Sequence, residues 1–99
     1  MTIESKKENG TLTISMEGEV NSQTAGDFEK AYSDNAEGIT RVNVDLEKVS
    51  HITSAGLRVI LTMQQDMDAA GGILKIMRPN QAIREVFRLS GFNTFLKIE

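Results

Sequence analysis

Hydrophobic and polar residues alternate in two stretches of this chain, and this spacing of two predicts β-strands. The first stretch covers residues 11–17, and Asn9-Gly10 just before it is typical of a hairpin turn. We therefore expect a first strand near residues 3–7 that pairs with residues 11–17 in antiparallel fashion. The same alternation in residues 41–46 predicts a third strand.

Apolar residues recur at helical spacing in two segments between and after these strands. Ser22 is the expected cap of the first helix, and Gly38 closes that segment. The third strand leads through residues 47–53 into a longer helix that begins at Ser54 and ends at Gly71-Gly72. The apolar face of this second helix is unusually wide.

The remaining sequence predicts a strand, a helix and a final strand. Ile73–Met77 is short and nearly continuously apolar, Pro79 with Asn80 opens a third helix that Gly91 ends, and residues 94–99 form the last strand. The order β-β-α-β-α-β-α-β predicts an α/β fold with a mixed five-stranded sheet, packed with helices. We expect residues 1–99 to form a single domain.

Composition narrows the possible chemistry. The 99 residues include no cysteine and one histidine, so the sequence offers no disulfide, thiolate metal site or imidazole cluster, and no metal or cofactor is predicted. The first ten residues lack the apolar region of a signal peptide, and no apolar run approaches the roughly 20 residues that span a bilayer. A cytoplasmic protein without membrane insertion is expected.

The charge distribution argues against nucleic acid as a partner. The net charge of −3 is spread along the chain, and no basic stripe with interleaved aromatic residues is present.

Enzymatic activity has little support either. His51 is the sole candidate base for a serine nucleophile, no Gly-x-Ser-x-Gly elbow surrounds Ser54, and the carboxylates form no obvious pair in an apolar pocket. We expect His51 to be a partly buried side chain at the strand end.

Ser54 is the most informative candidate residue. It stands at the first turn of the second helix, beyond the carboxyl end of a parallel strand, where backbone N–H groups and the helix dipole favour an anion such as phosphate. From its position alone, Ser54 is better explained as a structural helix cap. Thr53 beside it is interpreted as a cap or packing residue, and Gly56 as a residue that permits close approach of helix and sheet.

Three segments together resemble a known family. They are Val44-Asp45-Leu46 followed by residues 49–61 with the run Ser54-Ala55-Gly56-Leu57-Arg58, then Gly18-Glu19-Val20-Asn21, and Arg78-Pro79 through Ser90-Gly91-Phe92. This pattern is similar to the STAS domain, found in bacterial anti-sigma-factor antagonists and in the tails of sulphate transporters. The resemblance covers nearly the whole chain.

The resemblance implies a non-enzymatic partner-switching protein. Similar members bind, when unphosphorylated, an anti-sigma factor that is also a serine kinase; phosphorylation releases the complex and a phosphatase restores it. Carried over, Ser54 is the phosphate acceptor, and the partner-binding residues are Asn21, Thr53, Ser54, Ala55, Gly56 and Arg58. A monomer or a weak dimer is expected.

The chain also departs from the family pattern. Many members have an acid where Thr53 and Asn21 stand, and a hydroxyl residue where Ala55 stands. These differences leave two alternatives open: a constitutive STAS accessory subunit of a lipid-transport ATPase, without a working phosphoserine, and a STAS domain that senses a small molecule at the same helix start.

Overall fold

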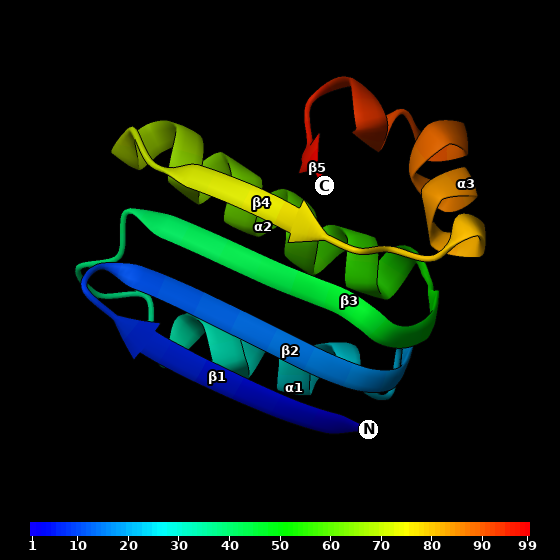
Figure 1. Ribbon diagram of the computed structural model, residues 1–99, viewed down its shortest axis with the longest axis horizontal. Coiled ribbons are helices and arrows are strands. Elements are labelled where there is room, and N and C mark those ends of the chain that lie inside the picture. Colours follow the sequence, from blue (N-terminus) through cyan, green and yellow to red (C-terminus); the bar gives the residue numbers. More distant parts are fainter.

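One five-stranded sheet, in the strand order β1-β2-β3-β4-β5, organises the molecule. The computed structural model describes residues 1–99, and Figure 1 shows the sheet face-on. The elements are β1 (Thr2–Glu8), β2 (Thr11–Val20), α1 (Ala25–Ser33), β3 (Arg41–Ile52), α2 (Ser54–Ala70), β4 (Ile73–Met77), α3 (Gln81–Ser90), the 3₁₀ helix η1 (Phe92–Thr94) and β5 (Lys97–Ile98).

The sheet is mixed, as the sequence predicts. β1 and β2 are antiparallel and are joined by a tight turn in which Asn9 and Gly10 both have positive φ, at 52° and 79°. β2, β3, β4 and β5 run parallel to one another. Crossovers through α1 and α2 connect the longer parallel strands, so their carboxyl ends meet at one edge of the sheet.

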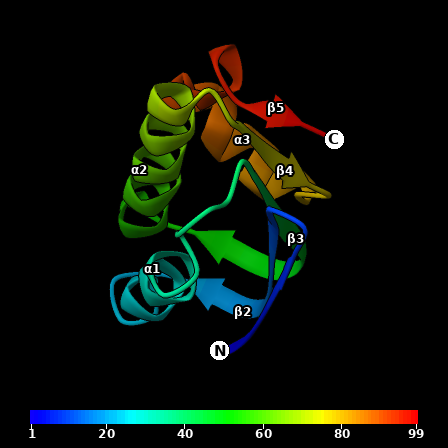
Figure 2. The same cartoon turned by 90° about the vertical axis from the view of Figure 1, so that its left-hand side faces the viewer.

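The hydrophobic core lies between the sheet and the helices. α1 and α2 cover one face of the sheet, which leaves the opposite face open, and α3 lies beyond the carboxyl end of β4 (Figures 1 and 2). The core contains 22 buried hydrophobic residues, and no charged or polar side chain is buried. Phe28, Ile60 and Phe87, one from each helix, are fully buried and join the helices to the sheet.

β3 is longer than the alternation predicts, because it contains two bulges. Its register with β2 shifts by one residue between Asp45 and Lys48, and again between Val49 and His51. Each extra residue lies in β3 and places two polar residues in succession on the surface, so the strict alternation ends at Leu46 while the strand continues to Ile52. Residues 47–53, through which the third strand was expected to lead into the second helix, are therefore strand as far as Ile52.

Helix and strand boundaries differ from the prediction in two other places. α1 begins after Thr24, not at the expected cap Ser22, and ends at Ser33, well before Gly38. The final segment forms a 3₁₀ turn and only two residues of strand, and the rings of Phe92 and Phe95 pack against each other with their centroids 5.0 Å apart. None of the helices has the length and hydrophobicity needed to cross a bilayer.

Candidate functional site

Ser54 is the first residue of α2, at the carboxyl edge of the sheet. The strand β3 ends at Ile52, and the extended residue Thr53 (φ −103°, ψ 179°) is the N-cap. The N–H of Thr53 donates to the carbonyl of Val20 at 2.9 Å, so the end of β3 is held against the end of β2 up to the residue before Ser54. Thr53 and Ser54 are both exposed.

The start of α2 lacks a side-chain cap. The hydroxyl of Thr53 accepts no hydrogen bond from the first turn, and that turn contains no acidic residue. The first N–H groups of an α-helix have no partner within the helix, and together with the helix dipole they form a region of positive potential. The first turn of α2 can therefore accept negative charge on Ser54 with little rearrangement.

Asn21 lies next to this turn, in the loop that follows β2. Val20 pairs with Ile52, so the residues that come directly after them, Asn21 and Thr53, emerge side by side from neighbouring strands. The Asn21 side chain is already engaged: Oδ1 accepts hydrogen bonds from the N–H groups of Gln23 at 2.9 Å and Thr24 at 3.2 Å. Asn21 therefore shapes the loop beside Ser54.

The other predicted partner-binding residues lie at different depths. Arg58 is exposed on α2 and Ala55 is half-buried, packed against the core. Gly56 is buried in the first turn of α2. A Cβ atom at this position would lie 2.6 Å from the Cγ1 of Ile52 and 2.7 Å from the Cγ1 of Val20, so glycine is what allows α2 to pack this closely on the sheet.

His51 is exposed, in contrast to the partly buried position expected for it. The reason is the second bulge of β3, which turns both Ser50 and His51 outward before Ile52 returns to the core. No group of three or more His, Asp or Glu side chains is placed to hold a metal ion.

Two residues that sequence reasoning did not connect with the site contact β3 just upstream of it. Arg78 follows β4, and its guanidinium pairs with the carboxylates of Asp45 and Glu47, the latter at 3.1 Å. Asn80 donates from Nδ2 to the carbonyls of Val49 at 3.2 Å and Ser50 at 3.1 Å. The sequence predicts Asn80 as the start of a helix, but it contains no signal for these contacts across the fold.

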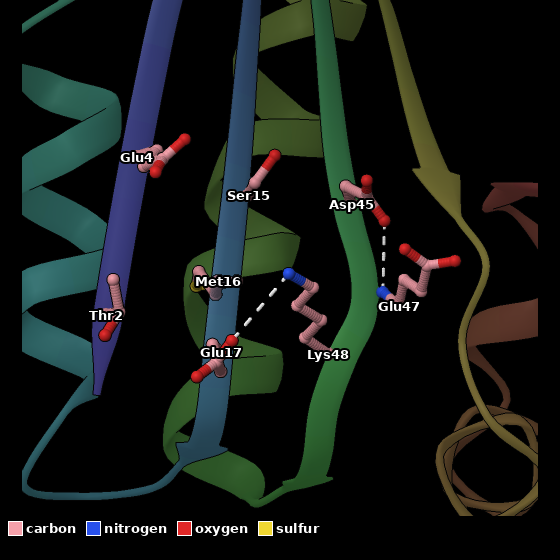
Figure 3. A pocket seen from close by; sticks show the side chains of 8 residues that line it. All are labelled: Thr2, Glu4, Ser15, Met16, Glu17, Asp45, Glu47 and Lys48. Carbon is pink, nitrogen blue, oxygen red and sulfur yellow. Dashed lines mark hydrogen bonds and ion pairs between the residues drawn. The ribbon is translucent and has the colours of Figure 1, made fainter.

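The open face of the sheet carries a separate, shallow cleft, drawn in Figure 3. Its volume is about 260 Å³, and its polar lining residues are Thr2, Glu4, Ser15, Glu17, Asp45, Glu47 and Lys48. Glu17 pairs with Lys48 at 3.9 Å, and the single guanidinium of Arg78 pairs with both Asp45 and Glu47. The cleft therefore keeps a net negative charge, which solvent screens on this open sheet face.

The chain is similar over nearly its full length to one family of known proteins. Residues 3–98 match the family model described as Mlab, STAS domain. The protein BtrV of Bordetella bronchiseptica, whose name assigns it as an anti-sigma factor antagonist, is 34% identical over 93 residues, which are 93% of this chain and 80% of BtrV. The chain therefore belongs to the STAS domain family, as the resemblance predicts.

Solved structures agree with this assignment at the level of the fold. The unphosphorylated form of the anti-sigma factor antagonist SpoIIAA is 17% identical, with a TM-score of 0.81 over 99% of this chain and 87% of SpoIIAA. The phosphorylated form of the Bacillus SpoIIAA gives a TM-score of 0.78 over 99% of this chain and 91% of that one, at 19% identity. An antagonist from Mycobacterium paratuberculosis gives 0.86 over 98% and 83%, at 21% identity.

Proposed function

We propose that this protein is an anti-sigma-factor antagonist whose binding to an anti-sigma factor is controlled by phosphorylation of Ser54. The observation that carries the proposal is the exposed Ser54 hydroxyl at the uncapped first turn of α2. The similarity to BtrV supports the antagonist function, and the SpoIIAA structures show that this fold exists in phosphorylated and unphosphorylated forms.

The proposed partner is an anti-sigma factor that is also a serine kinase. The Ser54 oxygen attacks the γ-phosphorus of ATP, a new O–P bond forms, ADP leaves, and the hydroxyl proton passes to a base of the kinase. This chain supplies only the acceptor and is not itself an enzyme. A phosphatase returns Ser54 to the hydroxyl form and so restores binding.

Phosphorylation has opposite effects on the domain and on the complex. A phosphate adds a charge of about −1.5 to −2, which the N–H groups and dipole of the α2 start stabilise, so the fold is retained. In the complex, the same charge is buried against a surface that fits a neutral hydroxyl, and an unpaired buried charge costs several kcal/mol. The affinity therefore falls about a hundredfold or more.

The surface around Ser54 defines the contact area of this partner. Asn21, Thr53 and Arg58 surround Ser54 with exposed or half-exposed polar groups, and Ala55 adds a small apolar contact. Small side chains at residues 53–55 leave the helix start accessible, which suits a kinase active site that must reach the Ser54 oxygen.

Three variants test the proposal. Wild-type and Ser54→Asp proteins are used to capture partners from native lysate, and the anti-sigma factor recovered is then titrated by calorimetry with wild-type, Ser54→Asp, Ser54→Ala and Thr53→Ala proteins. We expect tight binding by wild type and Ser54→Ala, a smaller loss for Thr53→Ala because its hydroxyl lies in the contact area, and a loss of about a hundredfold for Ser54→Asp. Thermal melting of Ser54→Asp within a few degrees of wild type shows that folding is intact.

Mass spectrometry after incubation with the recovered kinase and ATP locates the phosphate. We expect it on Ser54 and on no residue of the Ser54→Ala protein. Phosphorylation that persists in Ser54→Ala contradicts the assignment. Equal affinity of wild type and Ser54→Asp for a stable ATPase partner, with no phosphate transferred, favours a constitutive accessory subunit in its place.

A further inference from the structure

The two bulges of β3 are each held by one polar side chain from the loop between β4 and α3. The first bulge lies between Asp45 and Lys48, and the second lies at Ser50. Arg78 pairs with two carboxylates in this first bulged segment, those of Asp45 and Glu47. Asn80 donates to the carbonyl of Ser50 and to that of the residue before it.

These contacts take the place of hydrogen bonds that a longer β4 would make to β3. β4 pairs with β3 only from Arg41 to Asp45, whereas β2 pairs with β3 as far as Ile52. On the β4 side, the second half of β3 therefore lacks ladder hydrogen bonds, and unpaired strand carbonyls are costly to leave without a donor. The Asn80 amide supplies that donor at Val49 and Ser50.

Asn80 has a second bond that fixes its position. Its Oδ1 accepts from the N–H of Ile83 at 2.8 Å and so caps α3, while its Nδ2 points at β3. Hydrogen bonds therefore hold both the oxygen and the nitrogen of the Asn80 amide. Ser50 is four residues before Ser54, and the backbone hydrogen bonds of the segment between them go to β2.

We propose that Arg78 and Asn80, here called the staple, are positioning residues for Ser54. By holding the bulges of β3, they fix where the strand ends and hence where the first turn of α2 presents its hydroxyl. The inference rests on the proposed function, because it concerns the presentation of Ser54 to the anti-sigma factor. The local rigidity that it requires can be measured without any partner.

Substitutions at Asn80 separate the staple from the helix cap. Asp and Ser are both good N-caps, so Asn80→Asp and Asn80→Ser keep the bond to Ile83. Neither can donate to the two carbonyls of β3: aspartate carries no proton there, and serine is too short to reach both. Asn93→Asp is the matched control, because Asn93 is exposed and the same charge is added without loss of the staple.

Hydrogen exchange in the isolated protein provides the first readout. We expect amides of residues 49–57 to exchange about tenfold faster in both Asn80 variants than in wild type or Asn93→Asp, with α3 unchanged. The N–H of Thr53, bonded to Val20, is the central reporter. Unchanged exchange in this segment overturns the proposal.

Binding to the recovered anti-sigma factor provides the second readout. We expect both Asn80 variants to bind about tenfold more weakly than wild type, while Asn93→Asp binds normally. Because Asn80→Ser is neutral, its loss of affinity cannot come from added charge. Faster exchange with normal affinity for both variants overturns the positioning role.

If wild type neither binds an anti-sigma factor nor accepts phosphate, the proposed function is wrong. The exchange result still decides whether the staple rigidifies β3.

Discussion

The two longest helices, α2 and α3, begin in different ways. α3 starts at Asn80, whose side chain accepts a hydrogen bond from Ile83 at 2.8 Å. α2 starts at Thr53, which has the same extended backbone but makes no side-chain cap bond. Both helices end in the same manner, at a glycine with positive φ, Gly71 and Gly91.

The difference shows which helix start is structural and which is available. At α3 the cap residue satisfies the helix and also contacts β3, so its polar groups are used within the fold. At α2 no side chain bonds the first-turn N–H groups, so they stay open to solvent or to a bound group. Substitutions at and beneath the two helix starts should therefore have unequal effects.

Removing the glycine beneath the start of α2 has the largest expected effect. Gly56→Ala forces a Cβ atom into Ile52 and Val20, and we expect a loss of about 2 kcal/mol in the free energy of unfolding, more than the roughly 1 kcal/mol that alanine gains in a helix. Urea unfolding of Gly56→Ala and wild type measures this loss. Gly26→Ala in α1 is the control, because a Cβ added there would meet no atom within 4 Å, and it should be neutral or stabilising. Equal effects at the two glycines contradict the close-packing explanation.

Removing the two caps has unequal effects. Asn80→Ala loses the bond to Ile83 and the donors to β3, so we expect a cost of about 1.5 kcal/mol. Thr53→Ala removes a hydroxyl that caps nothing and should change the free energy of unfolding by less than about 0.5 kcal/mol. Thermal melts of the two variants at one pH compare them directly. Similar losses would show that Thr53 caps α2 in solution.

A capping side chain introduced at Thr53 should make the start of α2 resemble the start of α3. Thr53→Asp places an acceptor and a negative charge at the start of α2, and we expect a gain of about 0.5–1 kcal/mol in stability. Thr53→Asn supplies the acceptor without the charge, so the difference between the two variants should shrink as salt is added. No gain from either variant would mean that the first turn is already satisfied.

Acid should destabilise the fold at the ion pair between Asp45 and Arg78, and this is the smallest of the expected effects. Burial alone raises the pKa of Asp45, but the bonds from Arg78 and from the Glu47 N–H outweigh it, and the pKa lies below its ordinary value of 3.8. A lowered pKa stabilises the folded state above the unfolded pKa, and this contribution is lost as the pH falls through the folded pKa. The pH values 5 and 3 roughly bracket the pKa of this carboxyl in the unfolded chain. Between them, we expect the urea midpoint to fall less in Asp45→Asn than in wild type. An equal fall in both proteins contradicts a role for this carboxylate.

Local chemistry made most of the fold predictable. The alternation in residues 11–17, the Asn9-Gly10 turn and the strand Ile73–Met77 were confirmed because each depends on neighbours in the sequence. The helix ends at Gly71 and Gly91 were confirmed for the same reason. These features need no knowledge of distant contacts.

The features that the sequence did not predict depend on pairing across the fold. The second half of β3 has no simple alternation because its two bulges compensate a mismatch in length with β2, and only the paired strands reveal them. The same bulges expose His51. Arg78 and Asn80 reach β3 from far away in the chain, at separations of 30 to 33 residues, so no local pattern indicates their contacts.

The candidate site was located by its sequence motif, and its details came from packing. Ser54 lies at the helix start where the resemblance implies, beside Asn21 and Thr53. Gly56 was expected both to contact a partner and to permit close packing, and its burial against Ile52 and Val20 agrees with the second role. Whether Ser54 accepts phosphate stays a prediction for the experiments above.

The strand order of the sheet has a consequence for how the chain folds. Each strand pairs with the strand that precedes it in the sequence, from β1 through to β5. The β1–β2 hairpin needs no residue beyond Val20, and every later crossover adds one strand to the edge that has just formed. The hairpin closes over a tight turn, whereas the parallel pairs join distant residues, such as Leu12 with Val42 and Val42 with Leu74, so we expect the hairpin to form before them. During synthesis, the sheet can grow in the order in which its strands leave the ribosome, and no strand has to wait for a partner that is made much later.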